Sequence, residues 1–93
     1  MPYYLLSYTV VEDYLERRGA FREAHLELAR AAHARGELVL AGAVGDPVES
    51  AALVFRAADA SVAERFAEQD PYVRGGLVTE WRVQPWSVVI GGS

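Results

Sequence analysis

The sequence predicts an α+β fold whose elements follow the order strand, helix, strand, strand, helix, strand. Segments 3–10 and 38–44 are nearly continuous apolar runs, as in buried strands, whereas residues 20–35 carry apolar side chains with helical spacing. Two helices on one face of a four-stranded antiparallel sheet are the economical packing for this order. This is the ferredoxin-like βαββαβ arrangement.

Length, charge and cysteine content limit the class of protein. The 93 residues fit one domain, 1–93, whose core is thin enough for dimerisation to support it. The net charge of −4 disfavours nucleic acid and anionic membranes as partners. The chain lacks cysteine, a basic apolar leader, and any run approaching the roughly 18 apolar residues of a spanning helix. We therefore expect a cytoplasmic protein.

The first strand and the main helix fill the N-terminal part of the chain. Segment 3–10 is apolar on both faces, which predicts a central strand, and the charged segment 11–19 is expected to be a connection with a helical turn. The main helix, 20–35, ends at Gly36, because glycine tolerates the left-handed conformation of a helix cap. At about 100° per residue its apolar face comprises Phe21, Ala24, Leu28, Ala31 and Ala32.

A hairpin and a second helix are expected next. Strands at 38–44 and 51–57 flank a turn at Gly45-Asp46-Pro47, whose residue types punctuate secondary structure. Ser61 and Glu64 have the spacing of a capping box, in which each side chain bonds the other residue's amide, so a second helix should open there.

The C-terminal part is expected to hold one long and one short strand. The second helix should end by Asp70, because Pro71 disfavours helical geometry in the residue before it. Segment 78–83 alternates polar and apolar residues, as a half-buried strand does. Pro85 is predicted to break that strand, and 87–90 to form a short terminal strand.

His25 is the main candidate for chemistry. It lies about 40° from Phe21 on the helical wheel, so its imidazole should point into the helix–sheet interface. One interpretation is a structural histidine bonded to a backbone carbonyl. The other is a general acid or base, because histidine exchanges protons near neutral pH. His33 lies near the polar face and is predicted to be solvated, and no acidic residue completes a metal site with it.

Two carboxylates could orient His25. Asp70 precedes a proline, which either marks a helix-ending turn or aims the carboxylate at the histidine. Asp46 is also available, although its place in a turn already explains it, and the sequence leaves the choice between them open. Arg22 lies at the rim of the apolar arc, where it could bind an anionic substrate or pair with a glutamate.

Five segments resemble the YciI family, the YCII-related domain. Residues 22–26, Arg-Glu-Ala-His-Leu, resemble the family's Arg-Pro-Ala-His-Leu, and 38–42 resemble the Leu-Ala-Gly pattern of its second strand. Residues 70–73, with 75–77 and 83–86, resemble its C-terminal region from Asp-Pro-Tyr to Pro-Phe/Trp. Together these segments span nearly the whole chain in the family's order, although a glutamate stands where proline is usual in the first.

The resemblance implies a dimeric α+β barrel with an active site built around His25 and Asp70. It favours a lyase or isomerase that needs no cofactor or metal, in which His25 moves a proton on a small, possibly cyclic, substrate. Arg22 or Tyr72 would hold a polar substituent, and dehydrochlorinase-type elimination is among the activities associated with the family. The alternative is a non-catalytic small-molecule binding or accessory domain with the same pocket. In either case the expected partners are a second copy of the chain, as a homodimer, and a small molecule.

Overall fold

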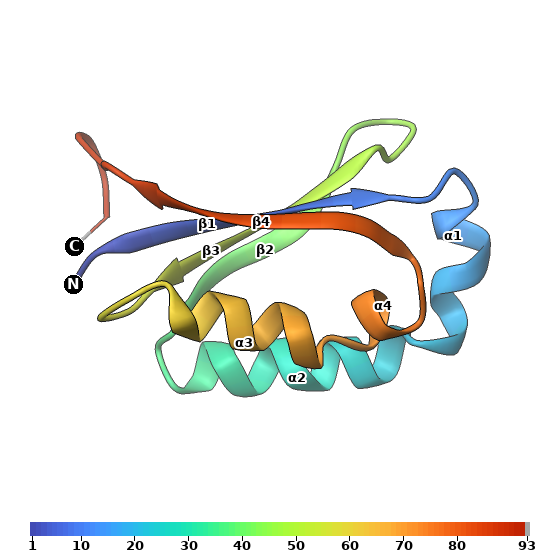
Figure 1. The fold of residues 1–93 in the computed structure, drawn as a ribbon, viewed down its shortest axis with the longest axis horizontal. Helices are drawn as coiled ribbons and strands as arrows, with labels where there is room; N and C mark the ends of the chain where they lie inside the picture. Colours follow the sequence, from blue (N-terminus) through green and yellow to red (C-terminus); the bar gives the residue numbers. More distant parts are fainter. Residues whose placement is uncertain (93) are drawn as a thin grey trace.

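A computed structural model describes residues 1–92 as a four-stranded antiparallel sheet with helices on one face (Figure 1). The spatial order is β2-β3-β1-β4, in which Leu6 of the inner strand pairs with Leu53 on one side and Val83 on the other. The predicted ferredoxin-like α+β fold is confirmed, as is the hairpin of β2 and β3. The strands are β1 (Tyr3–Val10), β2 (Leu38–Val44), β3 (Ser50–Arg56) and β4 (Val78–Trp86).

The helices lie beneath the sheet in Figure 1, and the opposite face of the sheet carries none. α1 and η1 occupy the connection in which a helical turn was expected, and α4 follows α3 directly. Within residues 1–92 no helix is both long and apolar enough to cross a membrane. The helical segments are α1 (Tyr14–Arg17), the 3-10 turn η1 (Arg18–Ala20), α2 (Arg22–Ala34), α3 (Ser61–Gln69) and α4 (Pro71–Arg74).

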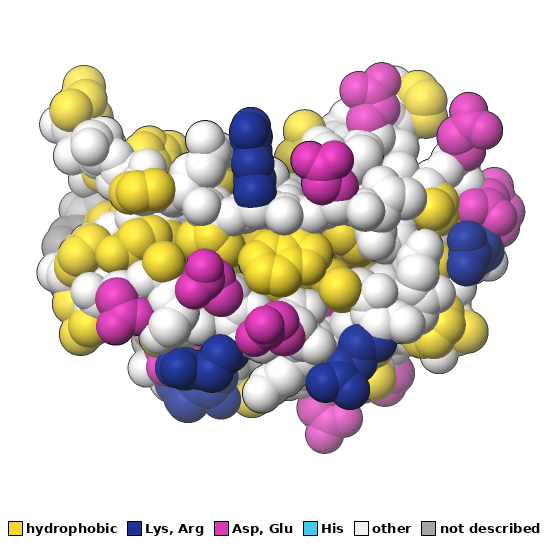
Figure 2. Space-filling model, viewed as in Figure 1, with side chains coloured by type: hydrophobic (Ala, Val, Ile, Leu, Met, Phe, Trp, Pro, Cys, Tyr) yellow, Lys and Arg dark blue, Asp and Glu magenta, His cyan; other side chains and the backbone are white. Residues whose placement is uncertain are grey.

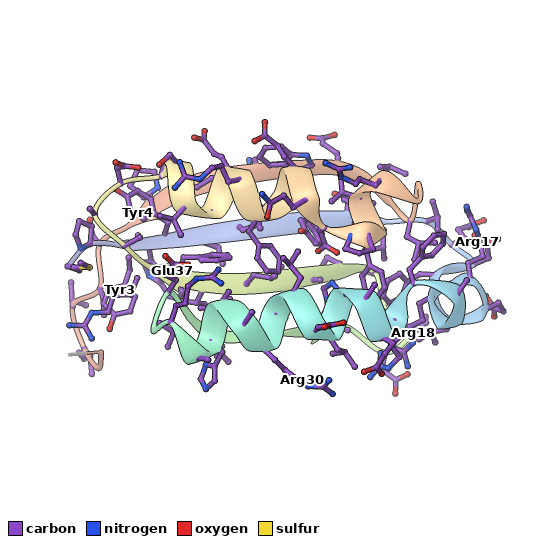
Figure 3. The ribbon with its side chains drawn as sticks, turned by 90° about the horizontal axis from the view of Figure 1, so that it is seen from below. Tyr3, Tyr4, Arg17, Arg18, Arg30 and Glu37 are labelled. Carbon is purple, nitrogen blue, oxygen red and sulfur yellow. The ribbon has the colours of Figure 1, made fainter. Side chains whose placement is uncertain are left out.

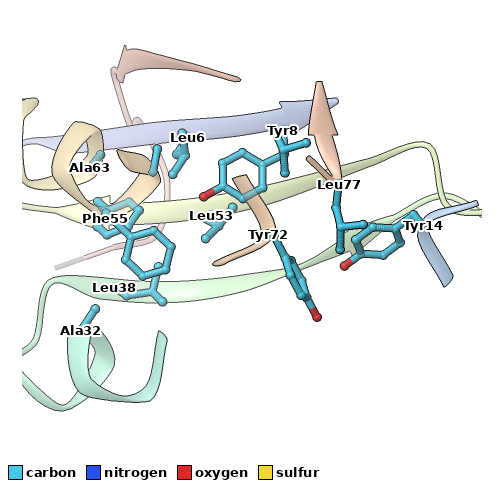
Figure 4. Close-up of a cluster of buried hydrophobic side chains, with 13 residues drawn as sticks. Leu6, Tyr8, Tyr14, Ala32, Leu38, Leu53, Phe55, Ala63, Tyr72 and Leu77 are labelled. Atoms are coloured by element: carbon cyan, nitrogen blue, oxygen red, sulfur yellow. The ribbon is translucent and has the colours of Figure 1, made fainter. Parts of the chain in front are cut away.

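The core lies between the sheet and the two long helices. Leu6 and Phe55 of the inner strands are fully buried, and the ring of Phe55 meets the edge of Phe66 from α3 at a centroid distance of 5.3 Å. Each such side chain contributes about 2 kcal/mol through its removal from water. At one end of this core three tyrosines replace the aliphatic residues (Figure 4). They are Tyr8, Tyr14 and Tyr72.

The buried face of α2 differs from the prediction. Ala32 is buried and Leu28 is half-buried, but Ala24 and Ala31 are exposed. The helical wheel gives every alanine the same weight, and these small side chains fix the rotation of the helix poorly. The half-buried residues of α2 are His25, Leu26, Leu28 and Ala29.

The predicted capping box at α3 is wrong. Ser61 is the first helical residue rather than the cap. The N-cap residue is Ala60, and no side-chain capping hydrogen bond forms there. The backbone amide and the hydroxyl of Ser61 both donate to Asp59 Oδ1 instead. An aspartate two residues upstream therefore accepts the Ser61 amide, which the Glu64 side chain was expected to accept.

The C-terminal strand prediction is also wrong. β4 continues through Pro85, which pairs with Tyr4, and residues 87–90 form no strand. β4 is an edge strand, and an edge accepts proline because one side of the strand needs no amide donor. Figure 2 shows the face that β4 borders, with a band of hydrophobic side chains between charged residues of both signs.

Candidate active site

Asp70 is the N-cap of α4 and is fully buried. Its backbone is extended (φ −65°, ψ 122°), as expected of a residue before proline, and its Oδ1 accepts the amide of Tyr72 at 3.0 Å. Pro71 occupies the first helical position, where the missing N–H group leaves no hydrogen bond unmade. The Asp-Pro-Tyr sequence therefore builds a short helix whose cap carboxylate points into the protein.

Three donors surround the Asp70 carboxylate. Besides the Tyr72 amide, His25 Nδ1 lies 2.8 Å from Oδ1, and the Tyr8 hydroxyl donates to Oδ2 at 2.7 Å. Charge-assisted hydrogen bonds of this kind offset the loss of water around a buried carboxylate. Burial, and then the neighbouring Asp70, raise the pKa of Tyr8 far above its usual range. Tyr8 therefore remains a protonated donor.

The His25 imidazole is held between Asp70 and Tyr72. Its side chain is 15% exposed, and its ring stacks on Tyr72 with centroids 3.9 Å apart and planes 8° from parallel. Since the carboxylate accepts from Nδ1, Nε2 is the ring nitrogen left for a ligand. The histidine that bonds a backbone carbonyl is the exposed His33, whose Nδ1 lies 2.8 Å from the Leu38 oxygen.

A cavity of about 330 Å³ lies beside His25. One wall is the helical segment α1-η1-α2, from which Tyr14, Arg18, Arg22 and His25 face the cavity at spacings of four, four and three residues. Arg22 and His25, three residues apart, share one face of α2, and α1 and η1 bring Tyr14 and Arg18 to the same cavity. The opposite wall is the sheet, with Tyr8 among its contributions.

The sheet wall is made of small residues where β2 and β3 border the cavity. Ala41, Gly42, Ala43 and Ala51 line it there, and they leave space in front of the histidine. The Tyr72 hydroxyl is buried, and no hydrogen bond of standard geometry satisfies it among the described residues. Burial raises the pKa of Tyr72, and the nearby Arg22 guanidinium opposes that rise. The cavity therefore presents an imidazole, a phenol and two guanidinium groups.

The structure brings together the four residues singled out from the sequence. His25 and Asp70 are in contact, and Arg22 and Tyr72 line the same cavity as His25. Asp46 is exposed in the turn after β2, so Asp70 is the carboxylate that meets the histidine. Among residues 1–92 no group of three acidic, histidine or cysteine side chains is arranged to hold a metal ion.

Sequence reasoning missed Tyr8, Tyr14 and Arg18. Tyr8 lies in segment 3–10, which was predicted only as a central strand, and nothing local links it to a carboxylate 62 residues away. Tyr14 and Arg18 lie in the segment expected to be a connection, where a four-residue spacing predicts no common face, because α1, the 3-10 turn η1 and α2 are separate elements.

Comparison with known proteins relates the chain to one family. The YCII-related domain family matches residues 1–87. No curated protein sequence matches the chain significantly.

Two solved structures share the fold. One is 5-chloro-2-hydroxyhydroquinone dehydrochlorinase (TftG) from Burkholderia phenoliruptrix AC1100, in complex with 2,5-dihydroxybenzoquinone. It is 19% identical in sequence, and the match has a TM-score of 0.74 and covers 91% of this chain and 93% of that chain. The other is protein Atu4242 from Agrobacterium tumefaciens, 13% identical, with a TM-score of 0.62 over 96% of this chain and 94% of that one. At these identities the likeness shows the fold alone.

Proposed function

The chain belongs to the YCII-related domain family, and we propose that it is a lyase or isomerase whose His25–Asp70 pair transfers a proton on a small cyclic substrate. The observation that carries the proposal is the 2.8 Å contact between Asp70 Oδ1 and His25 Nδ1 at the wall of a cavity of about 330 Å³. A buried carboxylate bonded to a histidine that faces a cavity is a recurrent arrangement for acid–base chemistry.

In the proposed mechanism Asp70 fixes the tautomer of the imidazole. The carboxylate accepts a hydrogen bond from Nδ1–H, so the neutral ring presents the Nε2 lone pair to the cavity. Nε2 takes a proton from a carbon next to a carbonyl or ring oxygen, and the C–H electron pair forms a double bond. In a lyase the leaving group departs with its own bonding pair. In an isomerase the π pair of the carbonyl moves to its oxygen, and it returns to form the carbonyl again when the imidazolium gives the proton to another carbon.

The site also has the means to exclude water and to hold the imidazole still. The His25 side chain is largely buried, and the parallel Tyr72 ring limits its rotation. Holding a catalytic group in its reactive orientation removes an entropic part of the barrier. The structural likeness to a dehydrochlorinase supports an elimination among the reactions to be tested first.

The proposal is tested with chlorinated hydroquinones, measuring chloride release, and with small cyclic ketones in D₂O, measuring exchange of the α-proton by NMR. We expect turnover with at least one compound and its loss in His25→Ala. The matched control is His33→Ala, which changes the exposed histidine of the same helix and should leave turnover intact. Binding without turnover in the wild type would support the alternative, a non-catalytic binding domain.

A homodimer is the second part of the proposal. β2 is an edge strand of seven apolar residues, yet all of it except Leu38 is exposed. Leu40 is 65% exposed and Val44 49%, and the face of the sheet away from the helices is uncovered (Figure 1). An apolar edge strand beside an uncovered sheet face supports association with a second copy, because such surfaces are rarely left in water.

A further inference from the structure

We infer that the cavity selects a planar ring that carries an oxyanion, bound by Arg18 and Arg22 while His25 acts on the same ring. This inference rests on the proposed function and names the class of its substrate. The charge of the cavity is the first observation that supports it. Two guanidinium groups line the cavity and no aspartate or glutamate does, although the whole chain has a net charge of −4. A positive cavity in an acidic protein attracts anions.

Neighbouring arginines of the same helical segment are already paired. Arg17 lies 3.6 Å from Asp13, and Arg30 lies 3.4 Å from Glu23. Figure 3 shows Arg30 on the side of α2 away from α3, and Arg17 at the end of the molecule where α1 lies. These two residues have carboxylate partners within the chain.

Arg18 and Arg22 have no carboxylate partner in the described part of the chain. Arg18 lies over the Tyr14 ring, 5.7 Å from its centroid, and Arg22 lies near the Tyr72 hydroxyl. A tyrosine ring or hydroxyl does not neutralise a guanidinium group, so both positive charges remain available to a ligand. Arginine suits this role because its planar fork donates two parallel hydrogen bonds to a carboxylate.

The Tyr72 hydroxyl supplies a second, independent observation. The residue is 2% exposed, and its oxygen has no hydrogen bond of standard geometry among residues 1–92. The Arg22 and Tyr14 side chains lie beside this hydroxyl, and a bound oxyanion would give it an acceptor of standard geometry. An oxyanion between Arg22 and Tyr72 would accept a hydrogen bond from each of them.

The walls of the cavity fit a flat ring. Alanine and glycine residues of β2 and β3 form one wall, and a volume of about 330 Å³ is at the lower end for small-molecule sites. Arg22 and His25 are three residues apart on α2, so their Cβ atoms lie on one face about 5–6 Å apart. An oxyanion at Arg22 therefore places a carbon of the same ring near the imidazole.

The inference is tested by NMR titration of the full chain with benzoate and with benzamide, which share size and shape but differ in charge. We expect benzoate to bind at least tenfold more tightly, and Arg18→Gln and Arg22→Gln each to weaken benzoate about tenfold, as hydrogen bonds to charged groups do. Arg17→Gln is the matched control, because it removes the same charge one residue from Arg18 and should leave the affinity unchanged. Higher salt should weaken benzoate alone.

Three results would overturn the inference: no benzoate binding by the wild type at about ten millimolar, equal binding of benzamide, or wild-type affinity for benzoate in the Arg18→Gln/Arg22→Gln double variant. The titration measures binding and does not depend on turnover, so it separates this inference from the proposed function. Benzoate binding that depends on the arginines, in a protein without proton transfer, would overturn only the function. Proton transfer without that dependence would overturn only the inference.

Discussion

The rings of His25 and Tyr72 lie parallel, 3.9 Å apart between centroids, and a single oxygen of Asp70 accepts from both residues. That oxygen, Oδ1, bonds the imidazole Nδ1 and the backbone amide of Tyr72. The cap of α4 and the orientation of the imidazole therefore depend on the same carboxylate. A change at Asp70 should affect folding and the candidate site together.

Asp70→Ala should lower the free energy of unfolding by about 3 kcal/mol. It removes a helix cap, worth about 1 kcal/mol, and leaves the buried hydroxyl of Tyr8 without its acceptor. Urea denaturation measures the change. The control is Asp13→Ala, which removes an exposed carboxylate and should change stability by less than about 0.5 kcal/mol. Equal effects of the two substitutions would contradict the role given to the buried carboxylate.

Alkaline stability should depend on Tyr8. Its pKa is raised in the folded protein, so its contribution is fully present below the pKa of an unfolded tyrosine, about 10, and is lost as the pH rises above that value. We expect stability to fall by up to about 1.4 kcal/mol per pH unit above pH 10, and less steeply in Tyr8→Phe. Denaturation curves at pH 9 to 12 measure this. A slope in Tyr8→Phe identical to that of the wild type would contradict the prediction.

Gly75→Ala should destabilise the protein by about 1–3 kcal/mol. A Cβ atom at this position would lie 2.6 Å from the ring of Phe21, the residue directly before α2. In the wild type this ring packs against the glycine. Thermal unfolding measures the effect. Gly19→Ala is the control, because a Cβ there meets nothing within 4 Å. If the clash is the cause, Gly75→Ala should cost much less in a Phe21→Ala background.

Leu40→Lys should dissociate the proposed homodimer. Leu40 is the most exposed leucine of β2, and a lysine there would place a charge in an interface formed by that edge. Sedimentation velocity should show a dimer for the wild type and for Leu15→Lys, which changes an exposed leucine of α1 instead. A wild-type monomer at micromolar concentration would count against the homodimer.

The elements that the sequence predicted best are those with a long, unambiguous pattern. The bounds of β2 were predicted correctly, because segment 38–44 is apolar throughout and lies between a helix stop and a turn. α4 was missed because four residues hold too little periodicity, and Pro71 was taken to end one helix rather than to begin another. The aspartate before that proline was the available signal, since aspartate followed by proline is typical of a helix start.

The site was predictable only as far as local patterns reach. The helical wheel singled out His25 and the following proline drew attention to Asp70, but only the resemblance paired them, because their contact joins residues 45 positions apart. Tyr8 bonds the same carboxylate from 62 positions away, a distance at which neither helical nor strand spacing carries information. Its burial was foreseeable, and its partner was not.

The tautomer of His25 is the most direct test of the proposed mechanism, and ¹⁵N-resolved NMR of the imidazole nitrogens measures it without a substrate. We predict that neutral His25 carries its proton on Nδ1, donated to Asp70, with Nε2 unprotonated, and that Asp70→Asn disturbs this state because an amide can donate to Nδ1. His33 is the internal control, since the Leu38 carbonyl can only accept and should hold its Nδ1 proton in both proteins. A wild-type His25 protonated on Nε2, or a tautomer unaffected by Asp70→Asn, would contradict the mechanism.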